Sequence, residues 1–250
     1  MNNERILLGV LGGLGPMSTV YFCELLTAHT KAAIDADHID MLISSRASTP
    51  DRTAFILGKS TADPLPVMRQ EALRLQNAGA NLLVIPCNTA HYFYDGLKKA
   101  CDLPILNIIE ETVSHLAKAG TKVFGLLATE GTVRARSYER ICQSLGMTCL
   151  TPDREDQAFI SGAIYDAIKQ NKPVDQNAFL RVANKLIERG CERLVLGCTE
   201  LSLLKKEFSL PDDRFVDSLE VLAFKTILAC HKEPIGFPAT FERIRKGELV

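Results

Sequence analysis

The sequence predicts an α/β protein made of two similar halves, each a parallel sheet covered by helices on both faces. First, apolar runs of strand length alternate with segments of helical periodicity along the chain. Second, an apolar run that ends in cysteine, with threonine one or two positions later, occurs at Cys87 and again at Cys198. The cysteines are 111 residues apart (198 − 87), as are the preceding glycines Gly79 and Gly190 (190 − 79). We therefore expect a duplicated chain with one such thiol in each half.

The first half predicts strands and helices in alternation. No low-complexity stretch interrupts the pattern. In order, we expect a strand at Ile6–Leu11, a helix through about Thr30, a strand at Ile39–Ser44, a helix marked by Met68, Ala72, Leu75 and Ala78, strands at Leu82–Ile85 and Pro104–Ile108, and a helix at Glu110–Ala119.

The second half begins the same alternation again. We expect a strand at Val123–Leu127, a helix at Ala163–Gln170, a helix marked by Phe179, Val182, Ala183, Leu186 and Ile187, a strand at Leu194–Leu196 and a strand–helix pair at Phe215–Cys230. The last pair resembles Ile105–Leu116, so we expect it to return to the first unit. The predicted domains are 1–108 plus 215–250 and 109–214. The tail from Pro234, rich in proline, glycine and charge, is either a surface extension or a remnant of cloning, and it is assigned no role.

Composition excludes several classes of partner. Among 250 residues, 46% are hydrophobic and 24% charged, and the net charge is −1, which gives no general attraction to nucleic acid or anionic membranes. The apolar run after the polar start is too short for a signal peptide or a membrane span. We therefore expect a cytoplasmic protein with free thiols. The eight cysteines include no CxxC pair and no zinc-like Cys/His spacing, so no metal is expected.

The paired cysteines suit a reaction that takes a proton from one face of a carbon and returns one to the other. A free thiol has a pKa of about 8.5, and a helix N-terminus or a nearby cation lowers it. One sulfur then abstracts the proton as a thiolate while the other donates as a thiol. A lone buried cysteine is more often structural, and only the repeated context of Cys87 and Cys198 favours catalysis.

Two neighbours of these thiols are candidates for setting their protonation. His91 lies one turn beyond Cys87 and, if it is cationic, would favour the thiolate. Glu200 follows Cys198 and would keep that thiol protonated. Each also has a structural explanation, His91 as a core or capping residue and Glu200 as an acid in the first turn of a helix.

The segment Gly12-Gly13-Leu14-Gly15-Pro16-Met17-Ser18-Thr19 follows a strand and opens a helix. It matches the dinucleotide-binding fingerprint poorly, because Ser18 stands at the last small position and no acidic residue ends the second strand. A glycine turn whose amides, including that of Gly13, face a small carboxylate is the better interpretation.

Further polar residues fall where a ligand is expected. In parallel sheets, ligands lie beyond the carboxyl ends of the strands, where Thr129 and Thr132 follow the first strand of the second half. They could donate to a ligand or only cap a helix. Arg52, in a polar loop, carries a planar guanidinium suited to a carboxylate, although a solvated loop arginine is the alternative. Lys169 by itself is unremarkable.

These motifs together resemble one known family. The segments Gly12-Gly13-Leu14-Gly15-Pro16, Pro86-Cys87-Asn88-Thr89-Ala90-His91 and Gly197-Cys198-Thr199-Glu200 are similar to the aspartate racemase branch of the aspartate/glutamate racemase superfamily. The resemblance extends over about residues 5–230. Glutamate racemases usually open with Asp-Ser-Gly and carry His-Tyr after the second motif, where this chain has Glu200-Leu201.

The resemblance implies a fold, an activity and roles for individual residues. The fold would be two Rossmann-like (flavodoxin-like) domains related by a pseudo-two-fold axis, with the active site in the cleft between them, usually in a homodimer. The activity would be interconversion of L- and D-aspartate without pyridoxal phosphate or another cofactor. Family precedent gives Cys87 the D-enantiomer and Cys198 the L-enantiomer. The far carboxylate would bind Arg52 and Lys169, and further substrate contacts would be Asn88, Thr89 and Thr199.

Three alternatives remain open at this point. The substrate could be glutamate or a broader set of amino acids, because one methylene changes binding by only about 1–3 kcal/mol. The chain could also be an amino-acid-binding homologue without turnover. A redox dithiol is a third alternative, and it would require the two sulfurs to lie within disulfide reach.

Overall fold

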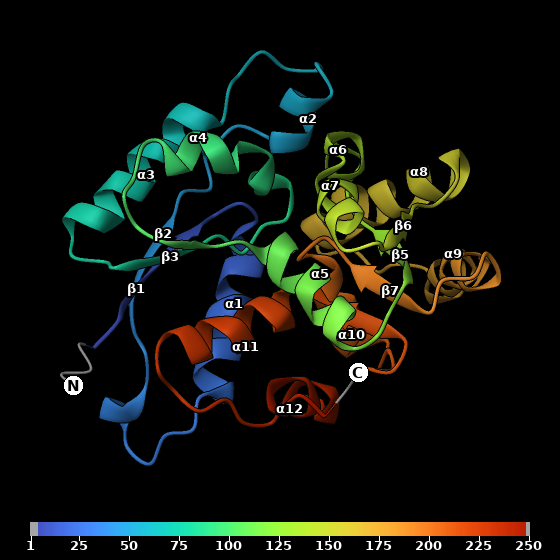
Figure 1. Cartoon of the computed structure of the whole chain (residues 1–250). Coiled ribbons are helices and arrows are strands. Elements are labelled where there is room, and N and C mark those ends of the chain that lie inside the picture. The colour runs from blue at the N-terminus through green and yellow to red at the C-terminus, as the bar shows by residue number, and fades with distance from the viewer. Residues whose placement is uncertain (1–4, 249–250) are drawn as a thin grey trace.

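The structure is a computed structural model that describes residues 5–248 and contains two four-stranded parallel sheets (Figure 1). The first sheet has the order β2-β1-β3-β4 and the second β6-β5-β7-β8. The strands are β1 (Leu7–Gly12), β2 (Asp40–Ser45), β3 (Leu82–Val84), β4 (Ile105–Leu106), β5 (Val123–Leu127), β6 (Thr148–Leu150), β7 (Arg193–Leu196) and β8 (Phe215–Asp217). The predicted α/β class is confirmed.

The helices cover both faces of each sheet. They are α1 (Pro16–His29), α2 (Arg52–Ile56), α3 (Leu65–Asn77), α4 (Tyr94–Lys98), α5 (Ile108–Lys118), α6 (Glu130–Ala135), α7 (Ser137–Ser144), α8 (Arg154–Gly162), α9 (Gln176–Glu188), α10 (Leu201–Glu207), α11 (Ser218–Ala229) and α12 (Ala239–Lys246). Short 3-10 turns occur at Asp35–Asp37, Thr89–Phe93 and Ile168–Gln170, and a π-helical turn at Ala163–Ala167.

The two sheets repeat the same topology. In each, the first strand lies between the second and the third, and the fourth pairs with the third. Gly79 and Gly190 end equivalent helices with similar left-handed φ values, +98° and +93°. Consequently the loops carrying Cys87 and Cys198 follow equivalent strands, β3 and β7. The repeat that the 111-residue spacing predicts is thus present in the fold.

Apolar periodicity explains how the layers pack. In α9 the buried side chains recur at helical spacing and pack in one hydrophobic core with residues of the second sheet. They are Phe179, Val182, Ala183 and Leu186. Removing one such side chain from water contributes roughly 2 kcal/mol. A central core joins the two halves through α1, α5 and α11, which lie between the sheets (Figure 1). This shared core fixes the carboxyl ends of β3 and β7 relative to each other.

The prediction that Phe215–Cys230 returns to the first unit is wrong for its strand. β8 pairs with β7 in the second sheet, with Val195 opposite Val216. Only the helix that follows, α11, packs against α1 of the first half. The Asp217 carboxylate caps α11 as the Asn107 amide caps α5, by accepting from backbone N–H groups, so the likeness to Ile105–Leu116 reflects the repeat itself.

Two further segments differ from expectation. The predicted helix Ala163–Gln170 is a π-helical turn followed by a 3-10 turn, so Lys169 lies on an irregular end of α8. The tail from Pro234 is not only a surface extension, because Phe241 of α12 is buried and its ring centroid lies 4.5 Å from that of His115. Between residues 5 and 248, no helix combines the length and apolar character needed to cross a membrane.

Candidate active site

Cys87 and Cys198 line the same cavity, between the carboxyl ends of β3 and β7. Its volume of about 10 Å³ leaves room for about one water molecule. Most of the other predicted site residues line it too, namely Arg52, Asn88, Thr89, Thr129, Lys169 and Thr199. Sequence reasoning did not propose Leu14, Asp51, Thr53 and Tyr165 as lining residues, and it gave Glu200 only a role beside Cys198.

The Cys87 thiol is buried next to cations. Burial raises the pKa of Cys87, and the charge of Glu200 adds to this effect, while the charges of Arg52 and Lys169 and the Ala90 N–H act in the opposite direction. The side chain is only 6% exposed, so little water reaches the sulfur. Because burial prevails, this thiol is protonated near neutral pH.

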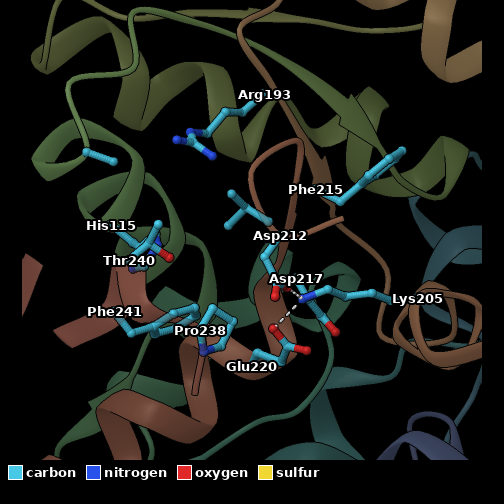
Figure 2. Close-up of a pocket in the computed structure, with 12 residues that line it drawn as sticks. His115, Arg193, Lys205, Asp212, Phe215, Asp217, Glu220, Pro238, Thr240 and Phe241 are labelled. Carbon is cyan, nitrogen blue, oxygen red and sulfur yellow. Dashed lines mark hydrogen bonds and ion pairs between the residues drawn. The ribbon is translucent and has the colours of Figure 1, made fainter. Parts of the chain in front are cut away.

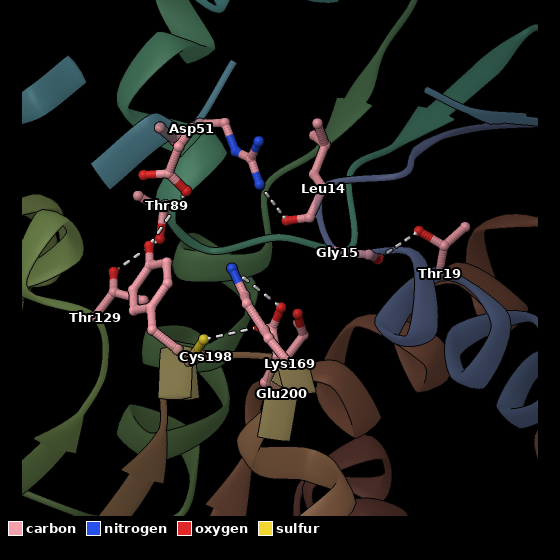
Figure 3. A network of polar contacts seen from close by, with 12 residues as sticks. Leu14, Gly15, Thr19, Asp51, Thr89, Thr129, Lys169, Cys198 and Glu200 are labelled. Atoms are coloured by element: carbon pink, nitrogen blue, oxygen red, sulfur yellow. Dashed lines mark hydrogen bonds and ion pairs between the residues drawn. The ribbon is translucent and has the colours of Figure 1, made fainter. Parts of the chain in front are cut away.

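The Cys198 thiol is held by a carboxylate. Its Sγ donates to Glu200 Oε2 at 3.0 Å, and Lys169 Nζ lies 3.6 Å from Glu200 Oε1 (Figure 3). Burial, and after it the negative charge of Glu200, raise the pKa of Cys198 well above the ordinary value. The direction agrees with the hypothesis that Glu200 keeps Cys198 protonated. The two thiols are thus electrostatically different, and Cys198 is the better candidate for the proton donor.

The hypothesis that His91 is a cation beside Cys87 is wrong in this structure. His91 Nδ1 donates to the Cys87 carbonyl oxygen at 2.8 Å, and Nε2 accepts from the Ile108 N–H at 3.3 Å. Burial lowers the pKa of His91 to about 4, so the ring is neutral. His91 therefore positions the backbone after Cys87 and joins it to the start of α5.

This neutral, buried histidine predicts a loss of stability in mild acid. Because His91 has a pKa of about 4 when folded and about 6.5 when unfolded, only the unfolded chain takes up this proton between those values. Stability is complete above pH 6.5 and declines as the pH falls toward 4. Between pH 7 and pH 5 we expect this residue to cost about 2 kcal/mol of unfolding free energy.

Urea unfolding of the wild type and of His91→Gln at both pH values measures this contribution. The variant keeps a donor and an acceptor but does not titrate, so it should lose less stability in acid. Comparing the two proteins also removes the effect of Glu220, whose pKa burial raises to about 7 and whose contribution has the opposite slope. Equal losses in the two proteins would contradict the assignment of a neutral His91.

Arg52 is a buried guanidinium that binds backbone carbonyls. Nη2 donates to the Leu14 carbonyl oxygen at 2.8 Å, and Nη1 donates to that of Pro50 at 3.0 Å and that of Thr49 at 3.3 Å. Its Nε is buried and has no partner within residues 5–248. Arg52 therefore joins the glycine-rich turn to the loop before α2 and leaves its Nε donor unused.

Three threonine hydroxyls form a cluster that spans the two halves. Thr89 Oγ1 lies 2.9 Å from both Thr129 Oγ1 and Thr132 Oγ1, and Thr129 caps α6 by accepting from the Thr132 N–H. Thr89 and Thr129 line the cavity, but Thr132 does not. The prediction that Thr132 contacts substrate thus differs from the structure, where it orients the other two hydroxyls.

Asn88 and Thr199 connect the thiol loops to the opposite half. The Asn88 amide donates to Ser218 Oγ at 2.9 Å and accepts from the Tyr138 hydroxyl at 2.7 Å. Thr199 Oγ1 donates to the Pro86 carbonyl oxygen at 3.3 Å. These bonds hold the two cysteine loops in register, and they leave an Asn88 Nδ2 hydrogen for a ligand.

Gly13 is not placed beside the thiols. Its N–H donates to Thr19 Oγ1 at 2.9 Å, so the amide is not free for a substrate carboxylate as predicted. Its φ is +79°, and a Cβ there would lie 2.4 Å from the Arg46 backbone nitrogen. The glycine is needed for this left-handed turn and for the close approach of the two loops. It lines a larger neighbouring cavity of about 430 Å³.

Figure 2 shows a second cavity, whose lining includes the charged side chains of Lys205, Asp212 and Glu220. Lys205 Nζ lies 2.6 Å from both Asp212 Oδ1 and Glu220 Oε2, so its charge is compensated within the cluster. Neither cysteine lines this cavity. Within residues 5–248, no three His, Cys, Asp or Glu side chains gather as a metal-binding group. The cavity that holds Cys87 and Cys198 is therefore the candidate active site.

A family model described as Asp/Glu/Hydantoin racemase matches residues 11–225, a span that includes both cysteines and most of the chain. The chain belongs to this family. It is thus an amino-acid racemase by family, and the resemblance of its motifs is confirmed at that level.

The names of similar proteins point to different amino-acid substrates. The broad specificity amino-acid racemase RacX of Bacillus subtilis is 26% identical over 226 residues, which is 88% of this chain and 96% of the relative. A glutamate racemase of Aquifex pyrophilus is 30% identical over 159 residues, 60% of this chain and 58% of the relative. The structure of Picrophilus torridus aspartate racemase is 27% identical with a TM-score of 0.79, covering 98% of this chain and 100% of that chain.

Proposed function

We propose that this protein interconverts L- and D-aspartate through two thiols, without a cofactor. The observation that carries the proposal is that Cys87 and Cys198 line one cavity together with the cations Arg52 and Lys169. One sulfur, as a thiolate, removes the α-proton and becomes a thiol. The other thiol gives its proton to the opposite face of the carbanion and becomes a thiolate. Protons balance, and the product is the mirror image of the substrate.

The same residues supply the stabilisation that this chemistry needs. A carbanion beside a carboxylate concentrates negative charge, and one well-placed donor in such a site is worth roughly 3 kcal/mol. Thr89, Thr129 and Asn88 are candidate donors to the α-carboxylate. Arg52 and Lys169 are the candidate partners of the far carboxylate, and pairing with both would fix Cα between the sulfurs.

Incubating the purified protein with L-aspartate and a reductant tests the proposal. Chiral chromatography should reveal conversion toward equal amounts of L and D without added pyridoxal phosphate. Incubation in deuterated water provides a second readout, because a binding protein without turnover would leave the α-hydrogen in place. Unchanged L-aspartate and no exchange would refute aspartate as the substrate.

Broad specificity is the second candidate, favoured by the name of the Bacillus subtilis relative, which matches 88% of this chain. A panel of L-amino acids under the same conditions distinguishes the two. If aspartate is the substrate, glutamate and neutral amino acids should be racemised markedly more slowly. Similar rates across the panel would support the broad alternative.

The raised pKa values of the two thiols predict an alkaline activity profile. Because burial raises the pKa of Cys87 and that of Cys198, neither sulfur is deprotonated readily at pH 7. Racemisation should therefore rise as the pH increases from 7 toward 9 and fall when the second thiol also loses its proton. Measuring kcat/KM between pH 6 and 10.5 checks this. A profile that is flat or declines above pH 7 would contradict it.

We also propose that the active species is a homodimer, as the family resemblance implies. Size-exclusion chromatography with light scattering at several protein concentrations tests this independently of activity.

A further inference from the structure

We infer that, before substrate binds, Glu200 occupies the place of the substrate's far carboxylate and holds both Lys169 and the Cys198 proton until an acidic amino acid takes over Lys169. The inference rests on the proposed function and deepens it, since it identifies what selects an acidic substrate. It makes Glu200 a positioning residue with two partners that substrate binding separates.

The contacts of Glu200 assign one partner to each carboxylate oxygen. Oε2 accepts from Cys198 Sγ at 3.0 Å, and Oε1 lies 3.6 Å from Lys169 Nζ (Figure 3). Glu200 is 5% exposed, and a buried carboxylate is costly without such partners. Lys169 also lies over the Tyr165 ring, 4.3 Å from its centroid. The lysine is thus positioned by Glu200 and Tyr165 while part of its side chain remains exposed to solvent.

The cavity volumes indicate that Lys169 and Glu200 have to move before a substrate can enter. The cavity with the thiols has about 10 Å³, room for about one water, and the neighbouring cavity has about 430 Å³. Arg52, Lys169 and Glu200 line both, so they form part of the wall between the two. An amino acid cannot reach the sulfurs unless this wall rearranges. A ligand that brings its own carboxylate gives Lys169 a new partner, and the cost of the exchange falls on Glu200, a buried carboxylate that loses its cation.

The glycine-rich turn leaves space for the Glu200 carboxylate. A Cβ added at Gly15 would lie 2.5 Å from Glu200 Oε1, so only glycine fits there with Glu200 in this position. Ser18 Oγ is buried, has no partner within residues 5–248, and lies 3.7 Å from the same point. This hydroxyl is a donor near Glu200 that would be available once Lys169 turns to the substrate.

The arrangement also decides which sulfur holds its proton. Cys198 donates to the Glu200 carboxylate, whereas Cys87 shares its cavity with Arg52 and Lys169, whose charges favour its thiolate against the opposing charge of Glu200. The charged groups around the thiols are Arg52, Lys169, Asp51 and Glu200, and only Glu200 contacts a sulfur in the described residues. Before substrate binds, Cys198 is therefore the acid, and Cys87 is the sulfur that becomes the base.

Ligand binding tests the competition at Lys169. Calorimetry with succinate, a dicarboxylate that cannot be racemised, should give a Kd about tenfold lower for Glu200→Gln than for the wild type. Asp51→Asn is the matched control, because it removes one negative charge from the same lining and keeps a good N-cap on α2. Its Kd should stay within about twofold. Propionate, with a single carboxylate, should gain little in either variant.

Gly15→Ala provides a second route to the same result. Its methyl group displaces Glu200 Oε1 without removing a charge, so succinate should again bind more tightly. This variant decides the question if Glu200→Gln does not fold. Unchanged succinate binding in a folded variant, or equal tightening in Asp51→Asn, would overturn the inference.

Thiol alkylation tests the proton at Cys198. In a Cys87→Ser background, the pH midpoint for alkylation of Cys198 should fall by about one unit or more in Glu200→Gln. Glu200→Asp, which keeps the charge, should leave the midpoint nearer the wild-type value. A midpoint that does not move in Glu200→Gln would contradict the positioning role. Neither experiment requires turnover, so failure of the wild type to racemise aspartate would be a separate result.

Discussion

Replacing Cys87 with serine is expected to reduce the racemisation of either enantiomer by about 10³-fold or more. A serine hydroxyl occupies nearly the same space but does not ionise at accessible pH, so it cannot act as the base. Cys198→Ser should have a loss of similar size, because each turnover uses one sulfur as base and the other as acid. The two enantiomers have equal free energies, so kcat/KM must fall by the same factor in both directions. Polarimetry from pure L- and pure D-aspartate measures it.

Hydrogen exchange in deuterated water then separates the two sulfurs. A variant with one thiol can still remove and return a proton on the same face, so it should exchange the α-hydrogen of one enantiomer without inverting it. Cys87→Ser and Cys198→Ser should exchange opposite enantiomers. Cys191→Ala is the matched control, because this buried cysteine lies just before β7 and outside the cavity. Exchange of both enantiomers by either single-thiol variant would refute a two-thiol mechanism.

The sequence predicted the repeat because the repeat lies in local patterns. Strand-like runs that end in cysteine, and glycines at equivalent helix ends, are visible without tertiary structure, and they correctly indicated the equivalence of β3 and β7. In parallel sheets, ligands bind beyond the carboxyl ends of the strands. Because both cysteines follow such strand ends, we expect them to share one site. Their common cavity agrees with that expectation.

Protonation states were beyond the reach of sequence reasoning. Spacing put His91 one turn after Cys87, but the pKa depends on burial and on both hydrogen-bond partners of the ring. The His91 ring is neutral, and it joins the Cys87 carbonyl oxygen to the Ile108 N–H through two hydrogen bonds. Glu200 illustrates the opposite case, because its neighbour in sequence, Cys198, is also its partner in space. Lys169 reaches Glu200 only through the irregular turn after α8, which periodicity predicted as a regular helix.

The placement of β8 failed for a related reason. No local sequence feature of a strand–helix pair determines which sheet the strand joins. The likeness to Ile105–Leu116 is explained equally well by the equivalent place of β8 in the second half. The prediction for the glycine-rich turn was incomplete for the same reason. Gly13 has the conformation expected of a tight turn, but whether its amide faces a ligand or Thr19 is decided by the helix that follows.

Replacing Arg52 should separate binding of the far carboxylate from chemistry at Cα. For Arg52→Lys, we expect kcat/KM for aspartate to fall about a hundredfold, corresponding to roughly 3 kcal/mol for loss of one partner of a buried, hydrogen-bonded charge pair. Lysine keeps the charge but lacks the planar fork, and it cannot keep the bonds to Leu14, Thr49 and Pro50 while also reaching a ligand. Most of the loss should appear in KM.

The control for this variant is a second substrate, a neutral amino acid, and no second mutation is needed. A neutral amino acid has no far carboxylate, so its slower racemisation should change much less than that of aspartate when Arg52 is replaced. A loss that is equal for both substrates would mean that Arg52 acts through the loops it joins, because those bonds are made whether or not a carboxylate is bound. Urea unfolding of Arg52→Lys measures that structural contribution directly. The proposed role requires that selectivity for aspartate falls, and that it falls by more than any loss of folded protein explains.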